Sequence, residues 1–208
     1  ERDLLDTQIR AVLHVAQTSD VRILFPMVIG SDDFARALAV LDSVVDQLGL
    51  LRKPPIGAMI ETPAALYALD EILDLADFVA IGTNDLTQYM LAADRDVAEL
   101  TDDCTPSHPA VLRAIKQVIV SATAKQRPVC VCGEAAGEPD FACLLVGLGI
   151  RELSLSPPCS AAVRRALRDI DNASARDIAQ KALGCRTADQ VRQLLSELCA
   201  TAVDSEST

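Results

Sequence analysis

Short apolar runs alternate with amphipathic segments along most of this chain, and this alternation restricts the fold to a narrow class. The pattern is typical of parallel strands joined by crossover helices, as in α/β proteins. Five of the runs are apolar almost throughout, as expected of strands that are covered on both faces. We predict strands at Val21–Val28, Ile56–Glu61, Phe78–Thr83, Val129–Gly133 and Glu152–Ser156.

The segments between the predicted strands have apolar residues at helical spacing. The first, Leu4–Ala16, is predicted to be a helix. The next is expected to begin at Ser31 as its N-cap and to stop before Gly49, because hydroxyl residues favour helix starts and glycine favours helix ends. Another clear helix is predicted after Ser107.

The C-terminal part of the chain, residues 171–208, is predicted to form helices and a frayed tail. Thr187 and Gln190 have the spacing of a capping box. Closing a barrel of eight strand-helix units takes about 250 residues, and this chain has 208. We therefore expect residues 1–170 to form either an open sheet or the C-terminal part of a larger (β/α)8 barrel.

Composition argues against several classes of function. The chain has 19 Lys and Arg against 30 Asp and Glu, and this negative charge disfavours a nucleic-acid partner. The longest apolar stretch, Phe141–Ile150, is far shorter than the roughly 20 residues that span a bilayer, and no secretory signal pattern follows Glu1. Seven cysteines without paired C-x-x-C spacing suggest neither a disulfide framework nor a zinc site. A cytoplasmic protein without membrane insertion is expected.

Polar side chains follow three successive predicted strands. Glu61 ends the second strand, Asn84 and Asp85 follow the third, and Cys132 ends the fourth. Functional groups gather at such strand ends in parallel strand-helix folds, and two carboxylates with water and substrate oxygens are enough to bind Mg²⁺. Glu61 and Asp85 could equally be helix N-terminal acids, which the helix dipole favours.

Cys132 and Arg95 are further candidates, each with a plainer explanation. A thiol at a strand end before Gly133 could exchange a proton in a cleft, but most buried cysteines only fill space, as Cys130 is expected to do. The guanidinium of Arg95 could bind an anionic oxygen or could simply be solvated. His14 and His108 are expected to be structural.

Four motifs carry a family resemblance. They are IETPAAL around Glu61, IGTNDLTQYMLAADR from Ile81 to Arg95, HPAVL from His108 and CGEAAG from Cys132. In this order they closely resemble the C-terminal phosphoenolpyruvate-binding domain of the phosphoenolpyruvate-utilising enzymes, above all enzyme I of the sugar phosphotransferase system. The similarity runs from about residue 2 to about residue 168.

The resemblance implies an eight-stranded barrel that binds phosphoenolpyruvate with Mg²⁺, of which about five strands lie in this chain. It also implies a histidine on a swivelling domain outside these residues, transfer to a phosphocarrier protein, and a homodimer. By the same resemblance, Glu61 and Asp85 ligate Mg²⁺, Asn84, Arg95 and Arg22 bind substrate, and Cys132 donates a proton to the enolate carbon.

The upstream arginines and the phosphohistidine motif of the family are absent from this chain, so it is expected to be a fragment that is inactive alone. Two other functions stay open at this point. One is a magnesium-dependent lyase or aldolase that handles an enolate on a similar barrel, which would need no thiol acid. The other is a non-catalytic fragment that serves in dimerisation.

Overall fold

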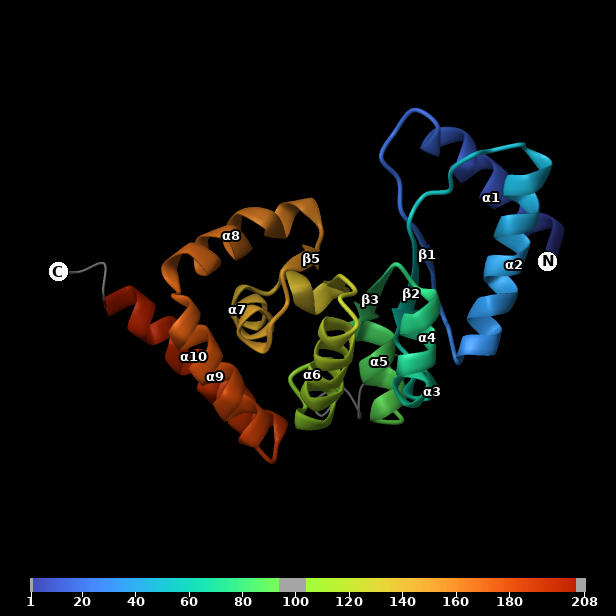
Figure 1. Cartoon of the computed structure of the whole chain (residues 1–208). Coiled ribbons are helices and arrows are strands. Elements are labelled where there is room, and N and C mark those ends of the chain that lie inside the picture. Colours follow the sequence, from blue (N-terminus) through green and yellow to red (C-terminus); the bar gives the residue numbers. More distant parts are fainter. Residues whose placement is uncertain (1, 94–103, 205–208) are drawn as a thin grey trace.

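The computed structural model describes residues 2–93 and 104–204. Its centre is a five-stranded, all-parallel sheet with the strands in sequence order (Figure 1). All five predicted strands are present, each shorter than its apolar run. They are β1 (Ile23–Phe25), β2 (Ile56–Ile60), β3 (Phe78–Gly82), β4 (Val129–Cys132) and β5 (Glu152–Ser154).

Helices cover one face of this sheet and extend beyond both of its edges (Figure 1). The α-helices are α1 (Arg2–Ala16), α2 (Ser31–Gln47), α3 (Pro63–Tyr67), α4 (Leu69–Leu75), α5 (Thr83–Met90), α6 (Pro109–Ala124), α7 (Pro139–Leu148), α8 (Ser160–Asp169), α9 (Asn172–Gly184) and α10 (Ala188–Asp204). The short 3-10 helices η2 (Glu134–Gly137) and η3 (Pro157–Cys159) follow β4 and β5.

The helix ends agree with the sequence pattern in part. Helix α2 begins at Ser31, but Gly30 takes the N-cap position and no side chain caps the helix, so the prediction of Ser31 as N-cap is wrong. Gly49 follows the helix with a φ of +65°, a left-handed conformation that glycine tolerates. Helix α6 begins after His108, whose Nδ1 accepts a hydrogen bond from the Ala110 N–H at 3.2 Å, which gives His108 the structural role expected of it.

The capping box before α10 is half formed. The Thr187 hydroxyl oxygen accepts from the Gln190 N–H at 3.3 Å, as predicted. The Gln190 side chain accepts instead from the N–H of Arg186 at 2.8 Å, one residue earlier than in a standard box. The expected fraying of the tail falls partly on residues 205–208, outside the described residues.

The two faces of the sheet have different compositions. The face under the helices is apolar and buried, with Ile56, Ile60, Val79, Ile81 and Val131 each at most 2% exposed. The opposite face is mixed, and the strand register places on it Leu24, Gly57, Met59, Phe78, Cys130, Cys132 and Glu152. The prediction that every strand is covered on both faces is wrong for the edge strands β1 and β5 and also for β4, all of which are only partly buried.

Helices α9 and α10 pack on the same core as the strand-helix units. A Cβ at Gly147 on α7 would lie 1.9 Å from the carbonyl oxygen of Ala175 on α9, so these helices are in backbone contact. Ala179, Ala182 and Val191 are buried in the common apolar core. The division of the chain near residue 170 remains a prediction.

Candidate active site at the carboxyl ends of the strands

The structure brings Glu61, Asp85 and Cys132 together at the carboxyl ends of three strands. Glu61 directly follows β2, Asp85 lies in the first turn of α5 after β3, and Cys132 is the last residue of β4. These three strands are neighbours, and Cys132 pairs in register with Gly82 at the end of β3. Since parallel strands end at the same edge, the predicted clustering follows directly from the topology.

Glu61 is buried, with 3% of its surface exposed. Its Oε1 accepts a hydrogen bond from the main-chain N–H of Met27 at 2.6 Å. Burial raises the pKa of the Glu61 carboxyl, the Met27 N–H opposes this shift, and the nearby Asp85 carboxylate adds to it. The Asp85 carboxylate therefore lies close enough to Glu61 to disfavour the charged form of the Glu61 carboxyl.

The helix-cap explanation fails for Glu61. The N-cap of α3 is Thr62, whose hydroxyl oxygen accepts from the Ala65 N–H at 3.1 Å, with Pro63 at the first helical position. Glu61 lies before this cap and outside the helix. Asp85 does lie in the first turn of α5, so a favourable interaction with the helix dipole is compatible with its position.

The donor set at this edge suits a hard divalent cation. Glu61 and Asp85 supply carboxylate oxygens, and a cation between them would offset both the burial of the Glu61 charge, which is the main cause of its raised pKa, and the smaller effect of Asp85. Among residues 2–93 and 104–204, no group of three or more His, Cys, Asp or Glu side chains is arranged to hold a metal ion. Mg²⁺ needs only one or two carboxylates, with water and substrate oxygens completing its shell.

Asn84 is oriented by the turn after β4. Its Oδ1 accepts a hydrogen bond from the Glu134 N–H at 3.3 Å, which makes the amide nitrogen the end that can donate to a ligand. Gly133, between Cys132 and this N–H, has a φ of +115°. A Cβ there would lie 2.3 Å from the Thr83 hydroxyl oxygen, so the close approach of the two turns requires glycine.

Cys132 presents a protonated thiol. Its Sγ donates to the carbonyl oxygen of Ile81 at 3.4 Å. Burial, helped by the neighbouring Cys130 and Glu61, raises the pKa of the Cys132 thiol to about 11. A cysteine nucleophile has a lowered pKa, so this thiol is suited to donate a proton rather than to attack.

Arg22 lies away from this cluster. It precedes β1, whose first residue pairs with the first residue of β2, so it is at the amino end of the sheet. Its guanidinium pairs with Glu152 at 3.3 Å and lies over the Phe78 ring, 5.6 Å from the centroid. The predicted substrate contact of Arg22 gains no support from this position. Arg95 falls outside the described residues.

The sequence interpretation missed Met27, Thr62 and Thr83 as partners of the site. Thr62 could have been found, because a threonine directly before a proline is a common helix start. The hydroxyl of Thr83 donates to the carbonyl oxygen of Cys132 at 3.0 Å, and this contact crosses between strands that are distant in sequence. No sequence signal marks the Met27 contact.

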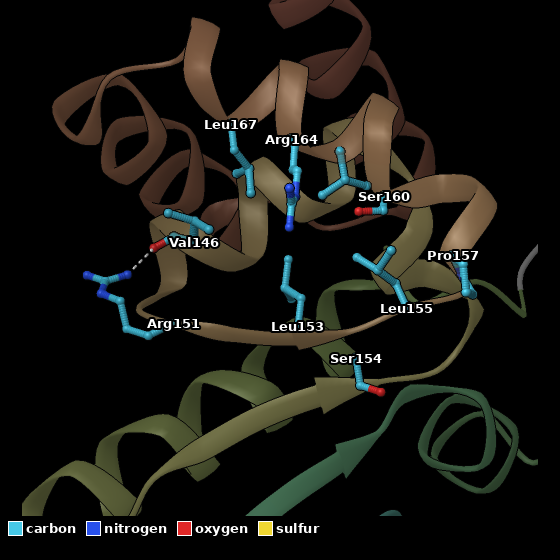
Figure 2. Close-up of a pocket in the computed structure, with 10 residues that line it drawn as sticks. Val146, Arg151, Leu153, Ser154, Leu155, Pro157, Ser160, Arg164 and Leu167 are labelled. Atoms are coloured by element: carbon cyan, nitrogen blue, oxygen red, sulfur yellow. Dashed lines mark hydrogen bonds between the residues drawn. The ribbon is translucent and has the colours of Figure 1, made fainter.

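A separate pocket lies on the outer side of β5, away from the clustered carboxylates. It has a volume of about 460 Å³ and lies between Leu153 and Leu155 on one side and helix α8 on the other, as Figure 2 shows. Arg164 points into it from α8, and Arg151 turns outward to donate to the carbonyl oxygen of Val146 at 3.2 Å. None of the candidate catalytic residues lines this pocket.

Comparison with models of known protein families shows the family of this chain. Residues 1–172 match the model of the phosphoenolpyruvate-binding domain of the phosphoenolpyruvate-utilising enzymes. The chain belongs to this family. The resemblance stated from the four motifs is therefore confirmed, and the family is one of enzymes.

Relatives of this domain occur in phosphotransferase proteins. The multiphosphoryl transfer protein of Rhodobacter capsulatus is 42% identical over 192 residues, covering 92% of this chain and 23% of that protein. The phosphoenolpyruvate-protein phosphotransferase of Haloferax volcanii is 37% identical over 203 residues, covering 94% of this chain and 36% of that protein. The chain thus spans 23% to 36% of the length of these curated relatives.

A solved structure supports the barrel type of the fold. A citrate lyase from Burkholderia xenovorans LB400 superposes with a TM-score of 0.61 and 18% sequence identity, over 96% of this chain and 69% of that one. This likeness concerns the fold alone. Together with the open five-stranded parallel sheet, it confirms the α/β class and the incomplete barrel. In the described part of the chain, no helix is both long and apolar enough to cross a membrane.

Proposed function

We propose that this chain is the phosphoenolpyruvate-binding and catalytic part of a phosphoenolpyruvate-protein phosphotransferase. The observation that carries the proposal is the meeting of Glu61, Asp85 and Cys132 at one sheet edge, two carboxylates and a protonated thiol. In the proposed reaction, the phosphoryl group passes to an enzyme histidine outside this chain and from there to a phosphocarrier protein, and pyruvate is released.

Substrate binding in this proposal depends on the ends of β2 and β3. Glu61 and Asp85 would hold Mg²⁺, which neutralises charge on the phosphate and on the developing enolate oxygen. The Asn84 amide nitrogen, oriented by the Glu134 N–H, donates to a phosphate oxygen. Arg95 is proposed as a second phosphate contact on the resemblance alone.

The proton step uses Cys132. When the P–O bond to the enol oxygen breaks, the electron pair of that bond stays on the oxygen. The product is the enolate of pyruvate. Ketonisation forms a C–H bond at the methylene carbon with the proton from Sγ of Cys132, and solvent then reprotonates the thiolate. The raised pKa of this thiol supports the assignment, because the group holds its proton until the enolate forms.

The assignment of Cys132 separates this function from a lyase or aldolase that handles an enolate with Mg²⁺ alone. In a full-length phosphotransferase containing this chain, Cys132→Ala is expected to lower pyruvate formation by about 10²-fold to 10⁴-fold, the range for a general acid. Unchanged turnover would remove the thiol from the mechanism. A cytoplasmic location, a role in sugar transport and a homodimer belong to the proposal as features of the whole enzyme.

Calorimetric titration with phosphoenolpyruvate, with and without Mg²⁺, tests the binding site in this chain. The expected result is Mg²⁺-dependent binding that the double variant Glu61→Gln, Asp85→Asn loses. The control variant Asp74→Asn, Asp189→Asn neutralises two carboxylates that are 67% and 83% exposed, and it should bind normally. Absence of binding to the folded wild-type chain, or equal binding by both double variants, would count against the proposal.

A further inference from the structure

The Glu61 carboxylate is enclosed by main chain on two sides. Oε1 accepts from the N–H of Met27, which is 34 residues earlier in the sequence, at 2.6 Å. Oε2 lies against Gly82, where a Cβ would come within 2.4 Å of it. One oxygen is thus held by the loop between β1 and α2, and the other lies against the end of β3, the strand that leads to Asp85.

Met27 donates this hydrogen bond from an unusual backbone conformation. Its φ is +55°, in the left-handed region that residues with a Cβ adopt only at a cost. The side chain gives no evident reason for this conformation, because it is 47% exposed. The loop around it is fixed on the same strand end, since the Thr62 hydroxyl donates to the carbonyl oxygen of Val28 at 2.9 Å.

From this geometry we propose that Met27 is the positioning residue for Glu61, and that its left-handed backbone aims the N–H that fixes the carboxylate for a divalent cation. The inference rests on the proposed function, in which Glu61 and Asp85 share that cation. With Oε1 held by the N–H, the carboxylate cannot rotate freely, and Oε2 stays against Gly82, at the end of the strand that leads to Asp85. Loss of a group that orients a metal ligand in this way commonly lowers metal affinity 10-fold to 100-fold.

Substitutions at position 27 can separate the backbone from the side chain. Met27→Gly adopts the left-handed φ without cost, so cation affinity should equal or exceed that of the wild type. Met27→Ala removes the side chain and keeps the strain, so affinity should be unchanged. Met27→Val makes the left-handed conformation much less favourable, so affinity should fall about tenfold.

Gln126 offers a matched control. It has a φ of +56°, is exposed, and lies in the turn between α6 and β4, at the amino end of the sheet. Gln126→Val should strain the backbone as Met27→Val does, and should lower the thermal midpoint similarly. Because Gln126 touches no part of the site, its substitution should leave cation affinity unchanged.

The experiment is titration of this chain and the four variants with Mn²⁺, a spectroscopic substitute for Mg²⁺, followed by electron paramagnetic resonance of the free ion. Thermal unfolding without metal provides the measure of folding. The expected order of affinity is Gly at or above Met and Ala, with Val lowest, and Gln126→Val equal to the wild type. Equal Mn²⁺ affinity of all Met27 variants would overturn the positioning role of Met27 and would leave the proposed function of the chain unaffected.

Hydrogen exchange followed by NMR adds a metal-free measurement. The Met27 amide should exchange at least tenfold faster in Glu61→Ala than in the wild type, since its acceptor is gone. Unchanged exchange would show that the hydrogen bond is not formed and would overturn the inference whatever the metal result. If the wild-type chain bound no Mn²⁺ although this amide was protected, the proposed function would fail for the chain, and the cation role of Met27 with it.

Discussion

Arg22 forms an ion pair with Glu152 across the concave face of the sheet, with Nη1 3.3 Å from Oε2. Arg22 immediately precedes β1 and Glu152 begins β5, so the pair joins the two edges of a five-stranded sheet. In a flat sheet, four strand spacings of about 4.8 Å would put these backbones roughly 19 Å apart. The contact therefore requires a strongly curved sheet.

Arg22, Phe78 and Glu152 lie at the height along the barrel axis that is expected of one layer of inward-facing side chains. Phe78 on β3 lies between the other two, beneath the Arg22 guanidinium, so the first, third and fifth strands each contribute one side chain. Relative to the strand register, the residue in this layer shifts by two positions toward the carboxyl end for every second strand, from Arg22 to Phe78 and from Phe78 to Glu152. Eight strands at this rate give the shear of 8 that eight-stranded parallel barrels have.

The Arg22 and Glu152 pair should contribute little to stability. Both side chains are about half exposed, at 50% and 51%, so water screens their attraction. A double-mutant cycle with Arg22→Met and Glu152→Gln should give a coupling free energy of about 0.2–1 kcal/mol that falls as salt is added. Urea unfolding of the four proteins measures it. A coupling of several kcal/mol, insensitive to salt, would show that the curvature depends on this pair.

Gly147→Ala should destabilise the whole chain. The new Cβ would meet the carbonyl oxygen of Ala175 at 1.9 Å, and neither backbone can move without separating α7 from α9. We expect a loss of about 1–3 kcal/mol or more in the free energy of unfolding. Gly184→Ala is the control, because a Cβ at Gly184 meets nothing within 4 Å, and it should be neutral or slightly stabilising.

The same pair of variants tests the predicted division near residue 170. If the C-terminal helices were a separate unit, Gly147→Ala would produce two unfolding transitions in circular dichroism. A single transition with a lowered midpoint is expected, because α7 and α9 share one core.

Gly133→Ala should remove phosphoenolpyruvate binding. It places a Cβ 2.3 Å from the Thr83 hydroxyl oxygen at a φ of +115°, so the turn carrying the Glu134 N–H must move away from Asn84. Gly149→Ala is the matched control, with a φ of +121° at the end of α7. Both variants should lose stability, and only Gly133→Ala should lose binding in calorimetry. Equal binding by the two would contradict the role of this turn.

Alkylation of Cys132 should depend steeply on pH. Only the thiolate reacts, and a pKa of about 11 leaves almost all of the thiol protonated near pH 8. Its reaction with iodoacetamide at pH 8, followed by peptide mass spectrometry, should be on the order of a hundredfold slower than that of an ordinary thiol with a pKa near 8.5. The rate should rise up to about pH 11, and a plateau below pH 9 would contradict the protonated state at neutral pH.

The sequence alone determined the five strands and the meeting of Glu61, Asp85 and Cys132 at their carboxyl ends. Strands β2 and β3 are found in their apolar runs because burial of the central strands leaves little room for polar residues. The meeting of Glu61 with Asp85 was predictable because neighbouring parallel strands end at one edge. These conclusions need only local pattern and chain direction.

The tertiary structure alone decided how those residues are held. Three contacts show this: the Met27 N–H with Glu61, the Glu61 Oε2 with Gly82, and Arg22 with Glu152. Each joins segments that are 21 to 130 residues apart in the sequence. A sequence pattern records which face of an element is buried, but not the approach of one backbone to another. The curvature of the sheet sets that approach here, and it is a property of all five strands together.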